Sequence, residues 1–263
     1  MAAAPPRGPA RRIILLGASN VARGISAILG TAAAVWGQPL EVFAAFGRGR
    51  SYGLPNRLLV RELSGIAQCG LWDAVGRRER LPTAALVTDI GNDLIYGRSV
   101  DEIVAWVDVC LARLAALDAQ IVVTGLPIDN LARLPAWQFR LAGKIFFPRH
   151  PIDLATLTER ACELDRRVAD LAARHGARSV AQRCEWFKID PIHISYWRMA
   201  RAWHEVLGAW LDAPPAVPPA RAAIGRALYL HSVFPERRKL FGFEQRTAQP
   251  AGRLRDGSAL WFY

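Results

Sequence analysis

The chain has 263 residues, of which 52% are hydrophobic and 22% are charged, and its formal net charge is +11. This composition excludes a disordered chain, and the length suffices for one large domain or two small ones with a sizeable core. The arginines are scattered through predicted helices rather than gathered in one stripe with aromatic residues, so we expect a basic surface and no nucleic-acid partner.

Cysteine usage and hydropathy limit the compartment and the chemistry. The four cysteines lie far apart and form no C-x-x-C pair, which argues against a zinc ribbon or a redox motif. No apolar run approaches the ~18 residues of a membrane span. The first apolar run is also too short for the core of a secretory signal. We therefore expect a cytoplasmic protein without a membrane span.

The opening stretch, residues 13–24, predicts a strand, a sharp turn and a helix. An unbroken apolar run stops at Gly17, Ser19 follows two residues later, and an alanine-rich segment continues to Trp36. Ser19 would stand at a helix N-terminus, where unpaired N–H groups and the helix dipole favour a negative charge. A capping serine fits the same pattern, so this stretch alone leaves both roles open.

Strands and helices alternate along the next 190 or so residues. Apolar runs predict strands at residues 40–46, 84–90, 120–125 and 179–181. Apolar residues at helical spacing predict helices at residues 21–36, 55–70, 100–116, 154–175 and 196–211. We expect residues 129–151 to form an irregular insertion. This alternation is typical of an α/β fold with a parallel sheet covered on both faces.

Proline content and charge divide the chain into four parts. We expect a disordered tail (1–12), an α/β domain (13–212), a stiff Pro-rich linker (213–220) and a C-terminal extension (221–263). Asp256-Gly257 between apolar runs predicts a hairpin turn. Because the extension closes with Leu-Trp-Phe-Tyr, we expect it to pack on the body or on a second subunit, which would make a homo-oligomer.

Polar residues follow four of the predicted strands. Ligands of open parallel sheets bind beyond the carboxyl ends of the strands. The residues at these ends are Ser19 after the first strand, Gly47 and Gly49 after the second, Asn92 after the third, and Asp190 with His193 after the last. We therefore expect these side chains at one edge of the sheet.

These residue types are those that nucleophilic catalysis by a serine requires. In Asp190-Pro191-Ile192-His193 the carboxylate can accept the Nδ1 proton of the imidazole, which leaves Nε2 facing the serine. The oxyanion donors would be the N–H of Ser19, the N–H of Gly49 and the amide of Asn92. Gly47 is the alternative to Gly49. Each feature alone also has a plain structural interpretation as a turn or a helix cap.

In this order the residues resemble the SGNH/GDSL hydrolases, over residues 13–211. The resemblance implies a flavodoxin-like three-layer α/β/α sandwich and an esterase, acetylesterase or lipase-like activity. It implies Ser19 as nucleophile, His193 as base and Asp190 as its orienting carboxylate, with Ser19, Gly49 and Asn92 as oxyanion donors. The family often has Gly-Asp-Ser where this chain has Gly17-Ala18-Ser19, and Gly-x-Asn-Asp where it has Ile90-Gly91-Asn92-Asp93.

The sequence therefore predicts a serine hydrolase that cleaves a small-molecule carboxylic ester through an acyl-enzyme, with neither a metal nor a cofactor. We expect substrate contacts from Gly47, Arg48, Arg50 and Asp93, and the two arginines would suit an anionic substrate. Three alternatives stay open: an acyltransferase using the same acyl-enzyme, a non-catalytic binding module, and a nucleotide-binding domain. The loop 47–53 misses the dinucleotide spacing G-x-G-x-x-G by one residue.

Overall fold

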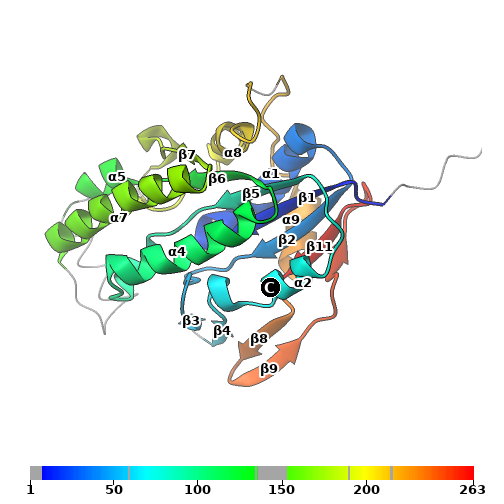
Figure 1. Ribbon diagram of the computed structural model, residues 1–263, viewed down its shortest axis with the longest axis horizontal. Helices are drawn as coiled ribbons and strands as arrows, with labels where there is room; N and C mark the ends of the chain where they lie inside the picture. The colour runs from blue at the N-terminus through cyan, green and yellow to red at the C-terminus, as the bar shows by residue number, and fades with distance from the viewer. Residues whose placement is uncertain (1–7, 59, 134, 136–152, 189, 214–215) are drawn as a thin grey trace, which may run out of the picture.

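A seven-stranded sheet forms the centre of the molecule (Figure 1). The computed structural model describes residues 8–58, 60–133, 135, 153–188, 190–213 and 216–263. In sheet order the strands are β10 (Gly252–Arg253), β11 (Ala259–Phe262), β2 (Leu40–Ala45), β1 (Arg11–Leu16), β5 (Thr83–Val87), β6 (Gln120–Thr124) and β7 (Arg178–Val180). Neighbouring strands are parallel except β10 and β11. The expected α/β class with a mainly parallel sheet is confirmed.

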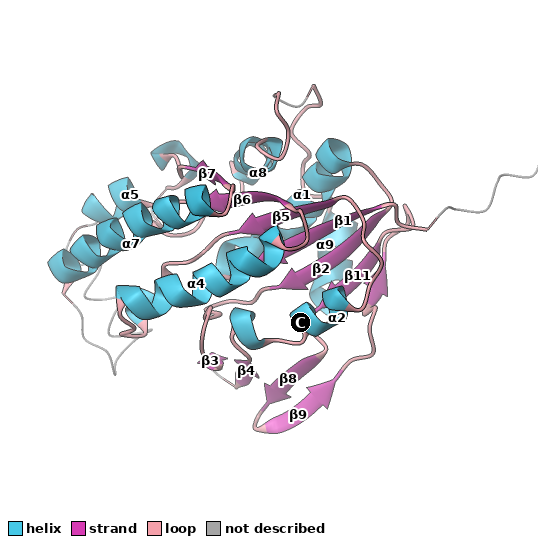
Figure 2. Ribbon diagram, viewed as in Figure 1, coloured by secondary structure: helices cyan, strands magenta, loops and turns pink. Residues whose placement is uncertain are grey.

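Helices cover both faces of this sheet (Figure 2). One face carries α2 (Leu71–Gly76), α4 (Val100–Ala115) and α7 (Leu154–Arg174), and the other carries α1 (Ser19–Trp36), α8 (Met199–Gly208) and α9 (Ile224–Ser232). Short helices are α3 (Asn92–Ile95), α5 (Ile128–Ala132), η1 (Ile66–Gln68) and η2 (Cys184–Trp186). In β1, Ile14 packs into one apolar layer and Ile13 into the other. Strands buried on both faces explain the continuous apolar runs.

Helix α1 packs against α8 through a glycine. A Cβ at Gly24 would lie 2.3 Å from Nε1 of Trp203, a fully buried residue of α8. This close approach fixes α1 relative to the second layer, and with it the position of Ser19 at the first turn of α1.

The prediction of a helix at residues 55–70 is wrong. This segment forms β3 (Asn56–Leu58), β4 (Arg61–Leu63) and η1. The two strands join β8 (Arg237–Leu240) and β9 (Phe243–Arg246) in a second sheet, in which Arg61 of β4 pairs with Leu240 of β8. The leucine spacing was helical, but pairing with a strand far along the chain decides the structure, and local spacing carries no signal for it.

The end of the chain belongs to the central sheet. Strand β11 pairs in parallel with β2, and Trp261 stacks on Phe43 at 5.0 Å between ring centroids. The predicted turn is present, since the Leu254 N–H donates to the Ser258 carbonyl and Gly257 has a φ of 88°.

Some expected boundaries need correction. Strand β1 begins at Arg11, inside the expected tail, because the buried guanidinium of Arg12 pairs with Glu41 at 2.6 Å. Residues 1–7 of that tail, 136–152 of the expected insertion and 214–215 of the expected linker lie outside the described residues. Of the helices that are described, none is long and apolar enough to cross a bilayer.

Candidate active site

The turn from β1 into α1 carries Ser19. A Cβ at Gly17 would lie 2.5 Å from Val21 Cγ2 and 2.8 Å from Thr88 Cγ2, so only glycine fits between the first turn of α1 and the end of β5. Ser19 is the first residue of α1 and is partly exposed. The backbone therefore turns sharply at Gly17 and presents the Ser19 hydroxyl at the carboxyl edge of the sheet.

The Asp89 carboxylate caps this turn, a role that sequence reasoning missed. Its Oδ2 accepts hydrogen bonds from the N–H of Ala18 at 2.8 Å and of Asn20 at 2.9 Å. Asp89 has a φ of 61°, a left-handed conformation that Asp tolerates better than most residues. Among the described residues the Ser19 N–H, between these two, meets no acceptor. It is thus left available for a ligand oxygen.

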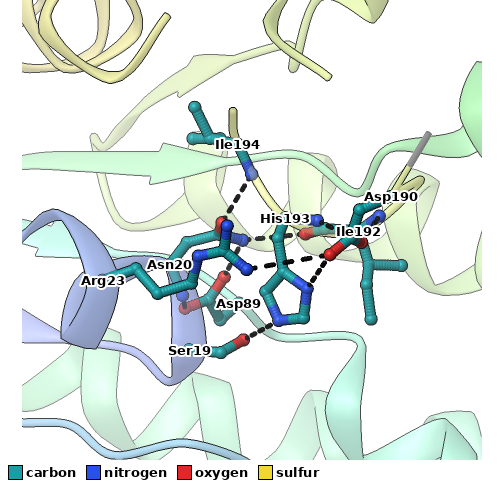
Figure 3. Close-up of polar contacts among 8 residues, drawn as sticks. All are labelled: Ser19, Asn20, Arg23, Asp89, Asp190, Ile192, His193 and Ile194. Atoms are coloured by element: carbon teal, nitrogen blue, oxygen red, sulfur yellow. Dashed lines mark hydrogen bonds and ion pairs between the residues drawn. The ribbon is translucent and has the colours of Figure 1, made fainter. Parts of the chain in front are cut away.

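Ser19, His193 and Asp190 form one chain of short polar contacts (Figure 3). The Ser19 Oγ lies 2.9 Å from His193 Nε2, and His193 Nδ1 lies 2.7 Å from Asp190 Oδ2. Partial burial works to raise the pKa of Asp190, but hydrogen bonds from the His193 ring and from two backbone N–H groups outweigh it and lower the pKa below its usual value. The carboxylate is therefore charged beside the imidazole.

Asn20 ties the histidine loop to α1. Its Nδ2 donates to the Ile192 carbonyl at 2.9 Å and to Asp89 Oδ1 at 2.7 Å, and its Oδ1 accepts the Ile194 N–H at 2.8 Å. These bonds hold the backbone on both sides of His193 (Figure 3). Apart from its place directly after Ser19, Asn20 carries no sequence signal that could have selected it.

Arg23 lies one turn further along α1, and its guanidinium faces the Asp190 carboxylate. Its Nη1 lies 3.7 Å from Asp190 Oδ2, and its guanidinium lies 4.7 Å from the centre of the Tyr196 ring. Both partners are partly or largely exposed, so this contact adds a modest charge stabilisation to Asp190. Helical spacing from Ser19 is the signal that could have selected Arg23.

Ser19 opens into a small cavity of about 70 Å³ that Asn92 also lines. The remaining lining is mostly apolar and includes Leu94, Leu126 and Leu157. The Asn92 Nδ2 is 3.4 Å from the Arg50 carbonyl, a long contact that leaves the amide protons free to bind another acceptor. A compact, largely apolar space therefore lies next to the serine and one amide donor.

The loop after β2 is brought to this site only in part. The Gly49 carbonyl accepts the Tyr96 hydroxyl at 2.7 Å, and Gly49 has a φ of 68°. Gly49 lines neither of two cavities near α1, whereas Gly47 and Arg48 line the second cavity, to which Ser19 does not contribute. Among the described residues no hydrogen bond or ion pair joins Gly47 or Arg48 to Ser19, and no cavity is lined by both.

Two residues expected to contact the substrate are buried in the fold. The Arg50 guanidinium is 1% exposed and donates to the main-chain oxygens of Ser64, Phe46 and Tyr263. The Asp93 carboxylate is fully buried and accepts the Tyr52 N–H at 2.8 Å. This burial speaks against the expected contact of Arg50 and Asp93 with substrate, because both side chains hold the loop backbone instead.

Comparison with known proteins identifies solved structures with the same fold. No family model and no curated protein matches the sequence. Solved structures do match: a carbohydrate acetylesterase family member from Sinorhizobium meliloti has a TM-score of 0.52 at 15% identity, over 75% of this chain and 95% of that one. The chain shares the α/β fold of this acetylesterase family member. The psychrotrophic esterase EstA from Pseudoalteromonas has the same fold, with a TM-score of 0.50 at 13% identity over 77% of this chain and 99% of that one.

A third solved structure agrees. The aryl esterase of M. smegmatis matches with a TM-score of 0.50 at 13% identity, over 74% of this chain and 96% of that one. At such identities the likeness establishes the fold alone, and the chemistry has to be argued from the side chains of this chain. Those described include no group of three or more His, Cys, Asp or Glu residues arranged to bind a metal ion.

Proposed function

We propose that this chain is a serine ester hydrolase that uses Ser19 as nucleophile, His193 as base and Asp190 as the group that orients the base. The observation that carries the proposal is the contact chain Ser19 Oγ–His193 Nε2–His193 Nδ1–Asp190 Oδ2, at 2.9 and 2.7 Å. A serine is a weak nucleophile until a base within hydrogen-bond reach takes its proton. The structural neighbours that are named as esterases support ester hydrolysis as the reaction.

The first half of the reaction forms an acyl-enzyme. The Ser19 Oγ attacks the ester carbonyl carbon while its proton passes to His193 Nε2, and the carbonyl oxygen becomes an oxyanion. Asp190 stabilises the resulting imidazolium through Nδ1. When the intermediate collapses, the carbon–oxygen bond to the leaving alcohol breaks and the proton on Nε2 moves to the alcohol. The acyl group is then held as an ester on Ser19.

The second half repeats these steps with water. His193 takes a proton from a water molecule, the water oxygen attacks the acyl carbon, and the carboxylic acid leaves as the proton returns to Ser19. In both halves the oxyanion would lie against the Ser19 N–H and the Asn92 amide, with the Gly49 N–H as a third donor. Removing one such donor typically costs ~10²–10³ in turnover.

The space beside the serine favours a short acyl group. The cavity that Ser19 and Asn92 share holds about 70 Å³, well below the ~300 Å³ of a small drug-sized pocket. Its apolar lining suits the methyl or ethyl end of an acyl chain. We infer that acetyl and propionyl esters are hydrolysed better than long-chain esters.

Labelling with a fluorophosphonate probe and hydrolysis of p-nitrophenyl acetate test the proposal together. We expect both to be lost in Ser19→Ala and kept in the matched control Ser232→Ala, whose hydroxyl bonds only the Tyr229 carbonyl of α9 among the described groups. A p-nitrophenyl acetate-to-decanoate series then tests the acyl length. Labelling that persists undiminished in Ser19→Ala would refute the proposal.

A further inference from the structure

A second cavity, of about 240 Å³, lies on the other side of the β1–α1 turn. The first cavity is lined by Ser19 and Asn20 at the start of α1, by residues that follow β5 and β6, and by α7. The second is lined by residues further along α1, by the loop after β2, by β4 and by the C-terminal segments 230–238 and 262–263. Because the sheet order is β11-β2-β1-β5-β6, the two cavities flank β1 from opposite sides. They share no lining residue.

The inner wall of the second cavity is apolar. Ile25 of α1 and Leu230 of α9 line it, and both are almost fully buried. Phe46 and Phe262 complete this wall with an edge-on ring contact at 5.1 Å between centroids. The wall can therefore hold an alkyl or aryl group out of water.

Three arginines gather at the same cavity: Arg48, Arg61 and Arg238. The Arg61 Nη2 donates to the Arg48 carbonyl at 3.3 Å, and the Arg238 guanidinium lies 3.8 Å from the centre of the Phe234 ring. Within the described part of the chain none of the three forms an ion pair, and no Asp or Glu lines the cavity. Burial, followed by the charges of Arg238 and Arg48, lowers the pKa of Arg61.

Arg48 is exposed, whereas Arg61 and Arg238 are partly buried. Like charges held close together repel one another, and an anion between them relieves that repulsion. Guanidinium groups bind carboxylate and phosphate groups through paired N–H donors. An inorganic anion would satisfy the arginines but leave the apolar wall empty, and a neutral apolar molecule would fill the wall but leave the charges unpaired. A ligand that carries both parts fits the cavity as a whole.

We propose that the second cavity is a binding site for an amphiphilic anion, a carboxylate or phosphate joined to a short apolar chain. The site depends on the C-terminal segments, since they supply Leu230, Phe262 and Arg238. It is separate from the chemistry at Ser19, and the proposal stands whether or not the chain hydrolyses esters.

Calorimetric titration of the full-length Ser19→Ala protein tests it, because no turnover can then consume a ligand. The probes are octanoate and octyl phosphate, with octanol, acetate and inorganic phosphate as partial ligands. We expect the two amphiphiles to bind at least about tenfold more tightly than any partial ligand, and more weakly as salt is raised. A preference for octanoate over octyl phosphate, or the reverse, identifies the headgroup. Equal binding of octanol, or no binding of either amphiphile, overturns the proposal.

Arginine variants in the same background locate the site. We expect Arg61→Gln and Arg238→Gln each to weaken amphiphile binding about tenfold, a loss of one charge-assisted contact. Arg237→Gln is the matched control, because Arg237 neighbours Arg238 on β8 but is exposed and does not line the cavity. Circular dichroism spectra that match the parent establish that the variants fold. Unchanged affinity in folded Arg61→Gln and Arg238→Gln would place the ligand elsewhere and overturn the assignment.

Discussion

Replacing Asn20 with alanine tests how the base is held against the serine. Asn20 is 3% exposed, and its side chain makes three hydrogen bonds that join α1 to Asp89 and to the backbone on both sides of His193. Alanine leaves the Ile194 N–H and the Ile192 carbonyl without these partners. An unsatisfied buried polar group costs ~1–3 kcal/mol, so we expect a loss of about 2–4 kcal/mol in the free energy of unfolding.

The expected effect on turnover follows from the same bonds. Without them the loop 190–194 is held to α1 mainly through the Ser19–His193 contact itself, and a displacement of the base by about 1 Å costs on the order of 10²-fold. We expect kcat for p-nitrophenyl acetate to fall by about that factor while KM stays nearly constant, since Asn20 contributes positioning rather than substrate affinity. Kinetics and urea unfolding of the same preparations measure the two effects separately.

Two controls separate positioning from general destabilisation. Leu207→Ala in α8 removes a fully buried side chain and should cost a similar ~2–5 kcal/mol without touching the histidine loop, so its kcat should stay at the parent value below the unfolding transition. Asn20→Asp keeps the shape but sets a carboxylate against Asp89, and should lose turnover as Asn20→Ala does. The reasoning is refuted if Asn20→Ala unfolds more easily yet keeps the parent kcat.

Three further changes test other parts of the structure. Gly24→Ala drives a Cβ to 2.3 Å from Trp203 Nε1, so we expect a loss of about 1–3 kcal/mol in urea unfolding; parent-like stability would contradict the close α1–α8 packing. Burial raises the pKa of Asp93 to about 6, so the folded state holds more protons than the unfolded state between about pH 4 and 6. The free energy of unfolding therefore falls as pH rises through this range, by about 3 kcal/mol in all. Asp93→Asn should remove that fall, and an unchanged pH slope would contradict it. Asp190→Asn should lower kcat by ~10³–10⁴-fold with little change in KM, as measured with p-nitrophenyl acetate; a smaller loss than tenfold would remove Asp190 from its proposed role.

The polar residues at the carboxyl ends of the strands were predictable from the sequence because the patterns that mark them are local. An apolar run followed by a glycine and a polar residue marks the strand ends before Ser19 and Asn92, and the D-x-x-H spacing marks Asp190 and His193 after the last strand. A parallel sheet brings the carboxyl ends of its strands to one edge. Ser19, Asp190 and His193 were selected in this way, and the structure joins them by hydrogen bonds. Whether they act as expected stays a prediction until turnover is measured.

The contacts that sequence reasoning missed depend on backbone geometry. Asp89 was taken only as the end of a strand, but β5 ends at Val87 and the chain then turns through a left-handed residue at Asp89. That turn aims the carboxylate at the first N–H groups of α1, next to Ala18, where the related motif often has its own Asp. No residue pattern reports such a conformation, so neither Asp89 nor its contact with Asn20 could be predicted.

The burial of Arg50 and Asp93 was missed for a different reason. Arg50 and Asp93 follow glycines and polar residues near the expected site, and charged side chains there are usually solvated or bind ligands. Burial of Arg50 depends on the main chain of Tyr263, which arrives beside the loop only because β11 pairs with β2. A strand more than 200 residues away in sequence therefore decides the environment of Arg50, beyond the reach of local reasoning.

This last contact explains how the C-terminal extension and the candidate site share one loop. The loop 47–53 is held on one side by α3, through the Asp93 bond to the Tyr52 N–H and the Tyr96 bond to the Gly49 carbonyl. It is held on the other side by Arg50, whose guanidinium donates to the main chain of Tyr263 after β11. Glycine residues have no side chain to pack and a permissive backbone, so the geometry of a glycine-rich loop depends on contacts from outside the loop. The position of the proposed Gly49 donor therefore rests on both the α/β body and the last residues of the chain.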